Sequence, residues 1–210
     1  IEDIASELKT RLKNIGISES NKIDILAHSM GGLVARYFIE KDGGNAFVNR
    51  LIMCGTPNGG SFFGKIDTYR KYLSIGASIA GILLSPAHAV TWIGSIVGVS
   101  KSLKAITGST AIMTKTLEQM NKGKSDFLTK LNERGNDSGI PYFILAGNLL
   151  NYTNQGFTDK VYRLLGNFVN GKEPNDIAVL TEDIKVKGQN TKVTIYDVPC
   201  HHLNYFTEPT

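Results

Sequence analysis

Apolar residues at the start of the chain follow a helical pattern. They recur three or four positions apart, with charged residues between them, at Ile1, Ile4, Leu8, Leu12 and Ile15. This spacing is typical of an amphipathic helix, and Gly16 follows where a glycine often ends one. We therefore predict a helix over the first 15 residues.

Four short apolar runs have the length of strands. They cover residues 22–26, 50–54, 141–147 and 192–198. Apolar residues follow one another in these runs without polar alternation, which favours a parallel sheet that is buried on both faces. Helical patterns separate the runs, so the sequence predicts an α/β fold.

The segment from about residue 62 to residue 137 differs from the rest of the chain. Residues 72–100 contain no Asp, Glu, Lys or Arg. Such a length could span a membrane, but Gly, Ser and Pro interrupt it, and two short apolar helices that meet near Ser85 and Pro86 fit better. We expect residues 1–61 and 138–210 to form the core and residues 62–137 to form a helical insertion.

Composition and charge narrow the classes of function. Hydrophobic residues make up 41% and charged residues 20% of the chain, as in a folded domain. The net charge is +4, but the basic residues are scattered, so we expect no nucleic-acid partner. Cys54 and Cys200 lack the spacing of a zinc site, and the sequence predicts no metal and no organic cofactor. Few cysteines and no visible signal peptide favour a cytoplasmic location.

The turn after the first predicted strand carries a candidate nucleophile. Ser29 lies where the strand gives way to a helical pattern, with Ala27 two residues before it and Gly31 two residues after it. A tight strand–Ser–helix turn requires small neighbours, because larger side chains would clash. The turn would place the hydroxyl at a helix N-terminus, where the N–H of Met30 could bind an oxyanion. A serine that only caps the helix is the alternative.

A serine nucleophile needs a histidine base, and the base follows the serine in this kind of fold. His28 belongs to the turn and is expected to face away from the hydroxyl, and His88 lies in the insertion. His201 and His202 follow the last predicted strand. We favour His202, because it begins an apolar segment that reads as a last helix, and we keep His201 as the alternative base.

The base in turn needs an acid that orients it. Asp176 lies in a Pro-Asn-Asp turn sequence between the third and fourth predicted strands. The alternatives are Glu182, Asp183 and Asp197. Asp197 lies inside the last predicted strand, too close to the base in sequence to reach round to it. We therefore favour Asp176.

Four segments, taken together and in this order, resemble the α/β-hydrolase lipases and esterases. Residues 27–36 (Ala-His-Ser-Met-Gly-Gly-Leu-Val-Ala-Arg) resemble their nucleophile segment, and residues 55–61 resemble their Gly-Thr-Pro-x-x-Gly-Ser turn. Residues 175–179 resemble their Asp-x-x-Val acid loop, and residues 202–206 their terminal His-x-x-Tyr segment. Within this group the chain is most similar to the triacylglycerol lipase, phospholipase and GPI-inositol-deacylase-like branch.

The resemblance implies an α/β-hydrolase fold and a serine hydrolase that cleaves carboxylic esters. Ser29, Asp176 and His202 would form the triad, and an acyl-enzyme would be the intermediate. Residues 62–137 would form a lid, and their apolar part, residues 72–100, would meet a lipid surface. The N-terminal part of the fold, with the second oxyanion donor, is expected upstream of Ile1.

Two other functions fit the same pattern. One is a non-catalytic module of this fold that binds lipid or protein through residues 72–100. The other is an acyltransferase or thioesterase, which would use the same triad with a different acceptor or substrate.

Overall fold

A computed structural model describes residues 1–62, 110–133, 137–151, 162–164, 166–167, 170–186, 188 and 190–206. The apolar stretch 72–100, to which we assigned two short helices and a lipid-facing surface, lies outside these residues. Within the described ranges, none of the helices combines the length and the apolar character needed to cross a bilayer.

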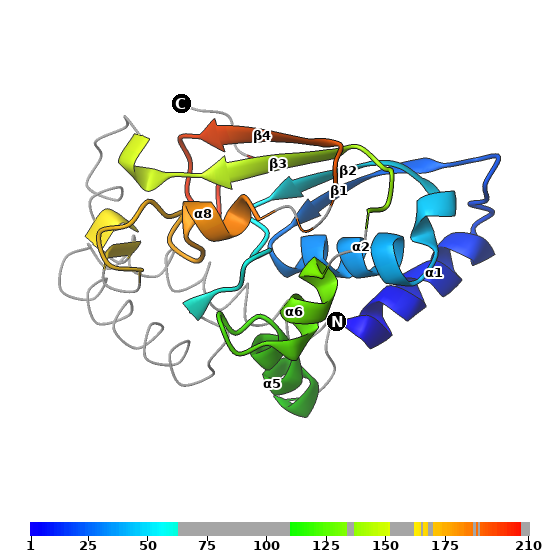
Figure 1. Cartoon of the computed structure of the whole chain (residues 1–210), viewed down its shortest axis with the longest axis horizontal. Coiled ribbons are helices and arrows are strands. Elements are labelled where there is room, and N and C mark those ends of the chain that lie inside the picture. Colours follow the sequence, from blue (N-terminus) through cyan, green and yellow to red (C-terminus); the bar gives the residue numbers. More distant parts are fainter. Residues whose placement is uncertain are drawn as a thin grey trace, which may run out of the picture.

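The described strands form one parallel sheet. Its strands are β1 (Ile23–His28), β2 (Val48–Cys54), β3 (Tyr142–Gly147) and β4 (Val193–Val198), and they lie side by side in chain order. Each covers most of a predicted apolar run, so the predicted α/β architecture is confirmed. All four strands point the same way (Figure 1), and their carboxyl ends therefore meet at one edge of the sheet.

Helices pack in layers on one side of this sheet. α1 (Glu2–Asn14) confirms the first predicted helix, and α2 (Met30–Lys41) follows β1 directly. α2 contacts β1 and β2, and α1 packs on α2 (Figure 1). α5 (Thr110–Gln119) and α6 (Asp126–Asn132) lie beyond α2, and the short α8 (Thr181–Ile184) contacts β3. Two single 3₁₀ turns are Gly44–Ala46 and Leu149–Asn151.

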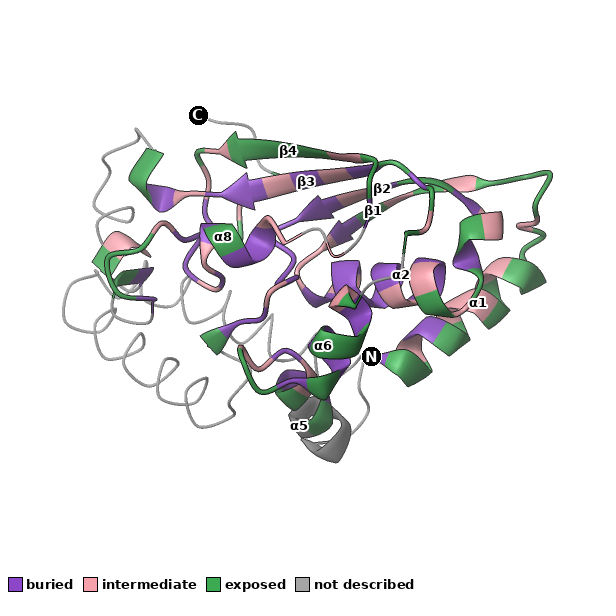
Figure 2. Cartoon of the chain, in the orientation of Figure 1, coloured by how far each residue is buried: buried purple, intermediate pink, exposed green. Residues whose placement is uncertain are grey.

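The two faces of the sheet differ in burial. Leu51, Met53 and Ile144 lie on the face that the helices cover and are fully buried. On the other face Leu26 is 59% exposed and Tyr196 is 50% exposed, and Figure 2 shows β4 largely in the colour of exposed residues. The expectation of two buried faces was therefore wrong for these strands, because an apolar run does not reveal whether a second layer covers it.

α5 and α6 belong to the segment that we expected to form the insertion. Their buried side chains join the same apolar cluster as α2 and the sheet: Leu117, Phe127, Leu128 and Leu131. Phe127 also stacks on Tyr37 of α2, with 5.9 Å between the ring centroids. The end of α5 and α6 thus complete the core around α2, and the division into core and insertion stays a prediction.

Candidate functional site

Ser29 occupies the sharp turn between β1 and α2. Its backbone has φ 53° and ψ −132°, a conformation that costs a non-glycine residue about 1–3 kcal/mol. Its N–H donates to the carbonyl of Cys54 at 2.9 Å, which ties the turn to β2. A Cβ on Gly32 would collide with the side chain of Thr56, so the turn requires a glycine there. Met30 is the first residue of α2, and its N–H is among those that a helix leaves without an internal partner.

Ser29, His202 and Asp176 form a hydrogen-bonded chain. Nε2 of His202 lies 2.9 Å from Oγ of Ser29, and Nδ1 lies 2.7 Å from Oδ2 of Asp176. An ionised carboxylate only accepts hydrogen bonds, so Nδ1 carries the ring proton and Nε2 accepts the serine proton. The Asp176 side chain is fully buried and that of His202 is 12% exposed. The structure therefore brings together the three residues that the sequence singled out.

The loop around Asp176 holds its carboxylate through the backbone. Oδ1 accepts the N–H groups of Ala178 at 3.1 Å and Val179 at 2.9 Å. Ile177 has φ 89°, an unfavourable value for a β-branched residue. The buried amide of Asn170 holds this strained residue by donating to its carbonyl at 2.7 Å. The strain thus lies beside the carboxylate, where the surrounding hydrogen bonds maintain it.

The segment that carries His202 differs from our expectation. We expected a last helix, but residues 201–206 form turns. The side chain of Asn204 accepts the N–H of His201 at 2.8 Å, and the N–H of His202 donates to the carbonyl of Asp176 at 2.7 Å. The Asn204 bond closes a turn on the backbone of His201, a local bond that side chains of this type often make outside helices.

His28 lies against the His202 segment. Its Nε2 donates to the carbonyl of His202 at 2.7 Å, and the two rings are 4.7 Å apart. Burial first, and then the nearby His202, lower the pKa of His28. A neutral His28 therefore supports the backbone of His202. The sequence placed His28 away from the serine hydroxyl, but it gave no sign of this contact with a residue 174 positions later.

His201, the alternative base, points elsewhere. Its ring packs on Tyr162 with 4.3 Å between the centroids, and its Nδ1 accepts the N–H of Leu203 at 3.2 Å. Burial lowers the pKa of His201 to about 4. The structure places His202, rather than His201, beside Ser29.

The alternative acids are paired with lysines. Glu182 and Asp197 both bind Lys185, at 3.2 Å and 2.9 Å. Asp183 binds Lys122 at 2.6 Å. Of the four acidic candidates, Asp176 is the one that contacts His202.

Tyr205 is a site residue whose role the sequence did not reveal. Its hydroxyl donates to Oδ2 of Asp176 at 3.0 Å and accepts the N–H of Gly147 at 2.8 Å. A side chain on Gly55, which has φ 59°, would lie 2.7 Å from both Asp176 and the Tyr205 ring. The tyrosine of the His-x-x-Tyr segment was the available signal, but the sequence could not say which group its hydroxyl meets.

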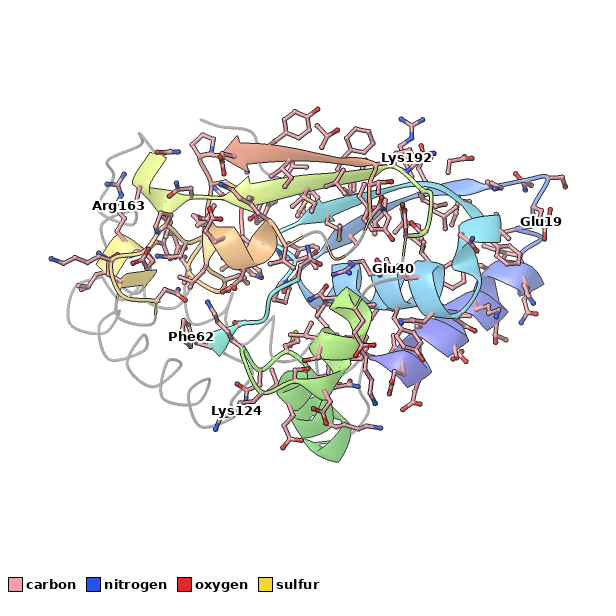
Figure 3. The ribbon with its side chains drawn as sticks, in the orientation of Figure 1. Glu19, Glu40, Phe62, Lys124, Arg163 and Lys192 are labelled. Carbon is pink, nitrogen blue, oxygen red and sulfur yellow. The ribbon has the colours of Figure 1, made fainter. Side chains whose placement is uncertain are left out.

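A buried polar network extends from α2 at Arg36 and Glu40. Arg36 of α2 binds Glu40 through two nitrogens, at 2.8 Å and 3.2 Å, and both side chains are fully buried. Arg36 also donates to Oδ1 of Asn58 at 3.1 Å, and the hydroxyl of Tyr142 donates to Glu40 at 3.0 Å. Figure 3 labels Glu40 on α2, beneath the sheet. The network joins the helix that follows Ser29 to the turn after β2 and to β3.

The two cysteines have the properties of structural thiols. Cys54 is 1% exposed, and burial raises its pKa to about 11. Burial, followed by the charge of Asp176, raises the pKa of Cys200 to about 12. Both thiols stay protonated near neutral pH and are poor nucleophiles. In the part of the chain that the structure describes, no cluster of three His, Cys, Asp or Glu residues is arranged to hold a metal ion.

Solved structures similar to this chain share its fold. A lipase of Bacillus licheniformis, BlEst2 in its mature form, aligns with a TM-score of 0.51 at 19% identity, over 94% of this chain and 64% of the lipase. The phospholipase PlaB of Legionella pneumophila aligns with a TM-score of 0.54 at 16% identity, over 88% of this chain and 34% of PlaB. The chain thus spans less than two thirds of either protein. It has the α/β-hydrolase fold that the sequence motifs implied.

Comparison with protein families gives the affiliation of the chain. A search of curated proteins found no match. The profile of a family described as a domain of unknown function, DUF7379, matches residues 2–210. This match covers nearly the whole sequence, and the chain therefore belongs to the DUF7379 family.

Proposed function

We propose that the protein is a serine hydrolase that cleaves carboxylic esters. One observation carries this proposal: Oγ of Ser29, the imidazole of His202 and the buried carboxylate of Asp176 form one chain of hydrogen bonds of 2.9 Å and 2.7 Å. The order Ser–His–Asp, with the histidine between a hydroxyl and a carboxylate, is the arrangement that activates a serine for acyl transfer.

Acylation begins when Oγ of Ser29 attacks the carbonyl carbon of the ester. Nε2 of His202 accepts the hydroxyl proton, and Asp176 stabilises the resulting imidazolium. The negative charge moves to the former carbonyl oxygen, where the N–H of Met30 at the start of α2 donates to it. His202 then gives the proton to the leaving alcohol, and an ester bond to Ser29 remains.

Deacylation repeats these steps with water. His202 accepts a proton from the water, whose oxygen attacks the acyl carbon. The second tetrahedral intermediate collapses, and the proton passes from His202 back to Oγ of Ser29. The products are the carboxylic acid and the free enzyme.

An ester with an apolar acyl chain is the substrate class that we propose. The sequence motifs resemble those of lipases, and the two structural neighbours named above are a lipase and a phospholipase. We further propose that the segment 62–137 includes a cap over the site and that its uncharged part, residues 72–100, meets the lipid. Detergent should therefore raise the rate on long-chain esters more than the rate on short-chain esters.

Labelling with a fluorescent fluorophosphonate tests the proposed nucleophile. The wild-type protein is expected to react, and Ser29→Ala is expected to lose the label while keeping its circular dichroism spectrum. Ser20→Ala, which changes an exposed serine near the N-terminus, is the matched control and should label normally. Equal labelling of the wild type and Ser29→Ala would overturn the proposal.

A panel of p-nitrophenyl esters and one thioester then identifies the reaction. Hydrolysis of the oxygen esters is the expected result. A wild type that takes the label at Ser29 but releases no acid would contradict hydrolysis and favour transfer to another acceptor. No labelling, even with detergent, would favour the non-catalytic binding module instead.

A further inference from the structure

We propose that Tyr205 is a positioning residue, whose hydroxyl fixes Oδ2 of Asp176 for its bond to His202. The inference deepens the proposed hydrolase function and rests on it. It begins from an observation that the mechanism above does not use: the Tyr205 hydroxyl and Nδ1 of His202 share one carboxylate oxygen, at 3.0 Å and 2.7 Å.

The contacts of Tyr205 decide the direction of its proton. A phenol has one proton to donate. The hydroxyl oxygen accepts the N–H of Gly147 at 2.8 Å, and the proton points to Oδ2 of Asp176. Burial, followed by the negative charge of Asp176, raises the pKa of Tyr205 far above its usual value. The phenol therefore remains protonated and acts as a constant donor.

The anchor of this hydroxyl is held firmly. Gly147 ends β3, and its carbonyl accepts the hydroxyl of Thr181 at 2.8 Å. A Cβ on Gly147 would lie 2.5 Å from the Tyr205 oxygen, so only glycine lets the ring approach this closely. The Tyr205 hydroxyl thus links the carboxylate of Asp176 to the end of β3 through two hydrogen bonds.

The Tyr205 bond completes the set of donors around the carboxylate. Oδ1 of Asp176 accepts the backbone N–H groups of Ala178 and Val179, and Oδ2 accepts His202 and Tyr205. A carboxylate has about four acceptor sites. Without the hydroxyl, Oδ2 would keep only Nδ1 of His202 as a partner. The carboxylate could then rotate, and Oδ2 would leave the direction in which the Nδ1–H bond points.

A cycle of four proteins separates positioning from packing: the wild type, Tyr205→Phe, Asp176→Asn and the double variant. Phenylalanine keeps the ring and removes only the hydroxyl. We expect Tyr205→Phe to lower kcat on a p-nitrophenyl ester about 10-fold, the lower end of the effect of a hydrogen bond to a charged group. KM should stay within about 2-fold, because the hydroxyl does not touch the substrate. In the Asp176→Asn background, the same change should lower kcat less than about 2-fold, because residues that act through one another are not additive.

A control variant and a second measurement make the result decisive. Tyr196→Phe removes a hydroxyl from a tyrosine of β4 that is 50% exposed, and should leave kcat unchanged. The Nδ1 proton of His202, observed by NMR at low temperature, provides a readout that needs no activity, and its resonance should move in Tyr205→Phe.

The outcomes distinguish this inference from the proposed function. An active wild type with an equally active Tyr205→Phe variant would overturn the positioning role and leave the hydrolase intact. A full 10-fold loss in the Asp176→Asn background would also overturn it, because Tyr205 would then act independently of Asp176. A wild type inactive toward every ester would contradict the hydrolase, and an unmoved Nδ1 resonance in Tyr205→Phe would then contradict the positioning role separately.

Discussion

Replacing Arg36 with methionine should strongly destabilise the protein. Arg36 and Glu40 are both fully buried one helical turn apart on α2. Methionine fills most of the space of the arginine stem but cannot donate a hydrogen bond. Glu40 would then keep the Tyr142 hydroxyl, at 3.0 Å, and lose both of its bonds to the guanidinium. Asn58 would lose the donor that now lies 3.1 Å from its Oδ1.

The size of the effect follows from these contacts. Removing one partner of a buried ion pair costs about 3–5 kcal/mol, because a charge is left without compensation. The acceptor of Asn58 adds about 1 kcal/mol. A loss of about 4–6 kcal/mol is a large part of the 5–15 kcal/mol that stabilises a typical domain. It should lower the melting temperature by about 10–20 °C.

Urea unfolding followed by circular dichroism measures this loss. Arg36→Met combined with Glu40→Gln is the matched variant, because glutamine can still accept from Tyr142 but carries no charge. The double variant should recover about 2 kcal/mol of the loss. A cost below about 1 kcal/mol for Arg36→Met, or no recovery in the double variant, would refute the reasoning that a buried charge dominates.

Two further predictions concern stability. Gly32→Ala would drive a methyl group into the side chain of Thr56 and should cost about 1–3 kcal/mol. Gly31→Ala, whose methyl group would meet nothing within 4 Å, should leave the melting temperature unchanged or raise it, and equal behaviour of the two variants would contradict the steric argument. Burial lowers the pKa of His201 from 6.5 to about 4. Between these pH values the unfolded chain therefore binds more protons than the folded protein does. The free energy of unfolding should fall by ~3 kcal/mol as the pH drops from 6.5 to 4. His201→Phe should flatten this part of the profile, measured by urea unfolding at each pH, and an unchanged slope would show that other groups cause it.

The parts of the fold that the sequence predicts are those set by local rules. The strand runs and the first helix follow from the spacing of apolar residues, and the Ser29 turn follows from the small residues around it. The order of Asp176 and His202 after Ser29 is the one that the α/β-hydrolase pattern implies. Their catalytic roles stay predictions, although the structure places the three side chains in one chain of hydrogen bonds.

The parts that the sequence could not predict depend on contacts between distant segments. The Tyr205 hydroxyl meets the N–H of a glycine 58 residues earlier, and no local pattern encodes that meeting. The turns at residues 201–206 are tied to a distant loop, where the carbonyl of Asp176 accepts the N–H of His202. The exposure of Leu26 likewise depends on which layers cover the sheet, because an apolar run has the same sequence pattern whether its second face is covered or exposed.

His202 and Asp176 are joined twice, and this has a consequence for the order of events in the proposed reaction. Their side chains bond through Nδ1 and Oδ2, and the N–H of His202 bonds to the carbonyl of Asp176, each at 2.7 Å. The two residues therefore form a closed ring that does not include Ser29. When Ser29 carries an acyl group, it can no longer bond to His202 through a hydroxyl proton, yet the ring keeps the imidazole in place. Nε2 of His202 would then already be oriented to accept a proton from the water that deacylates the enzyme.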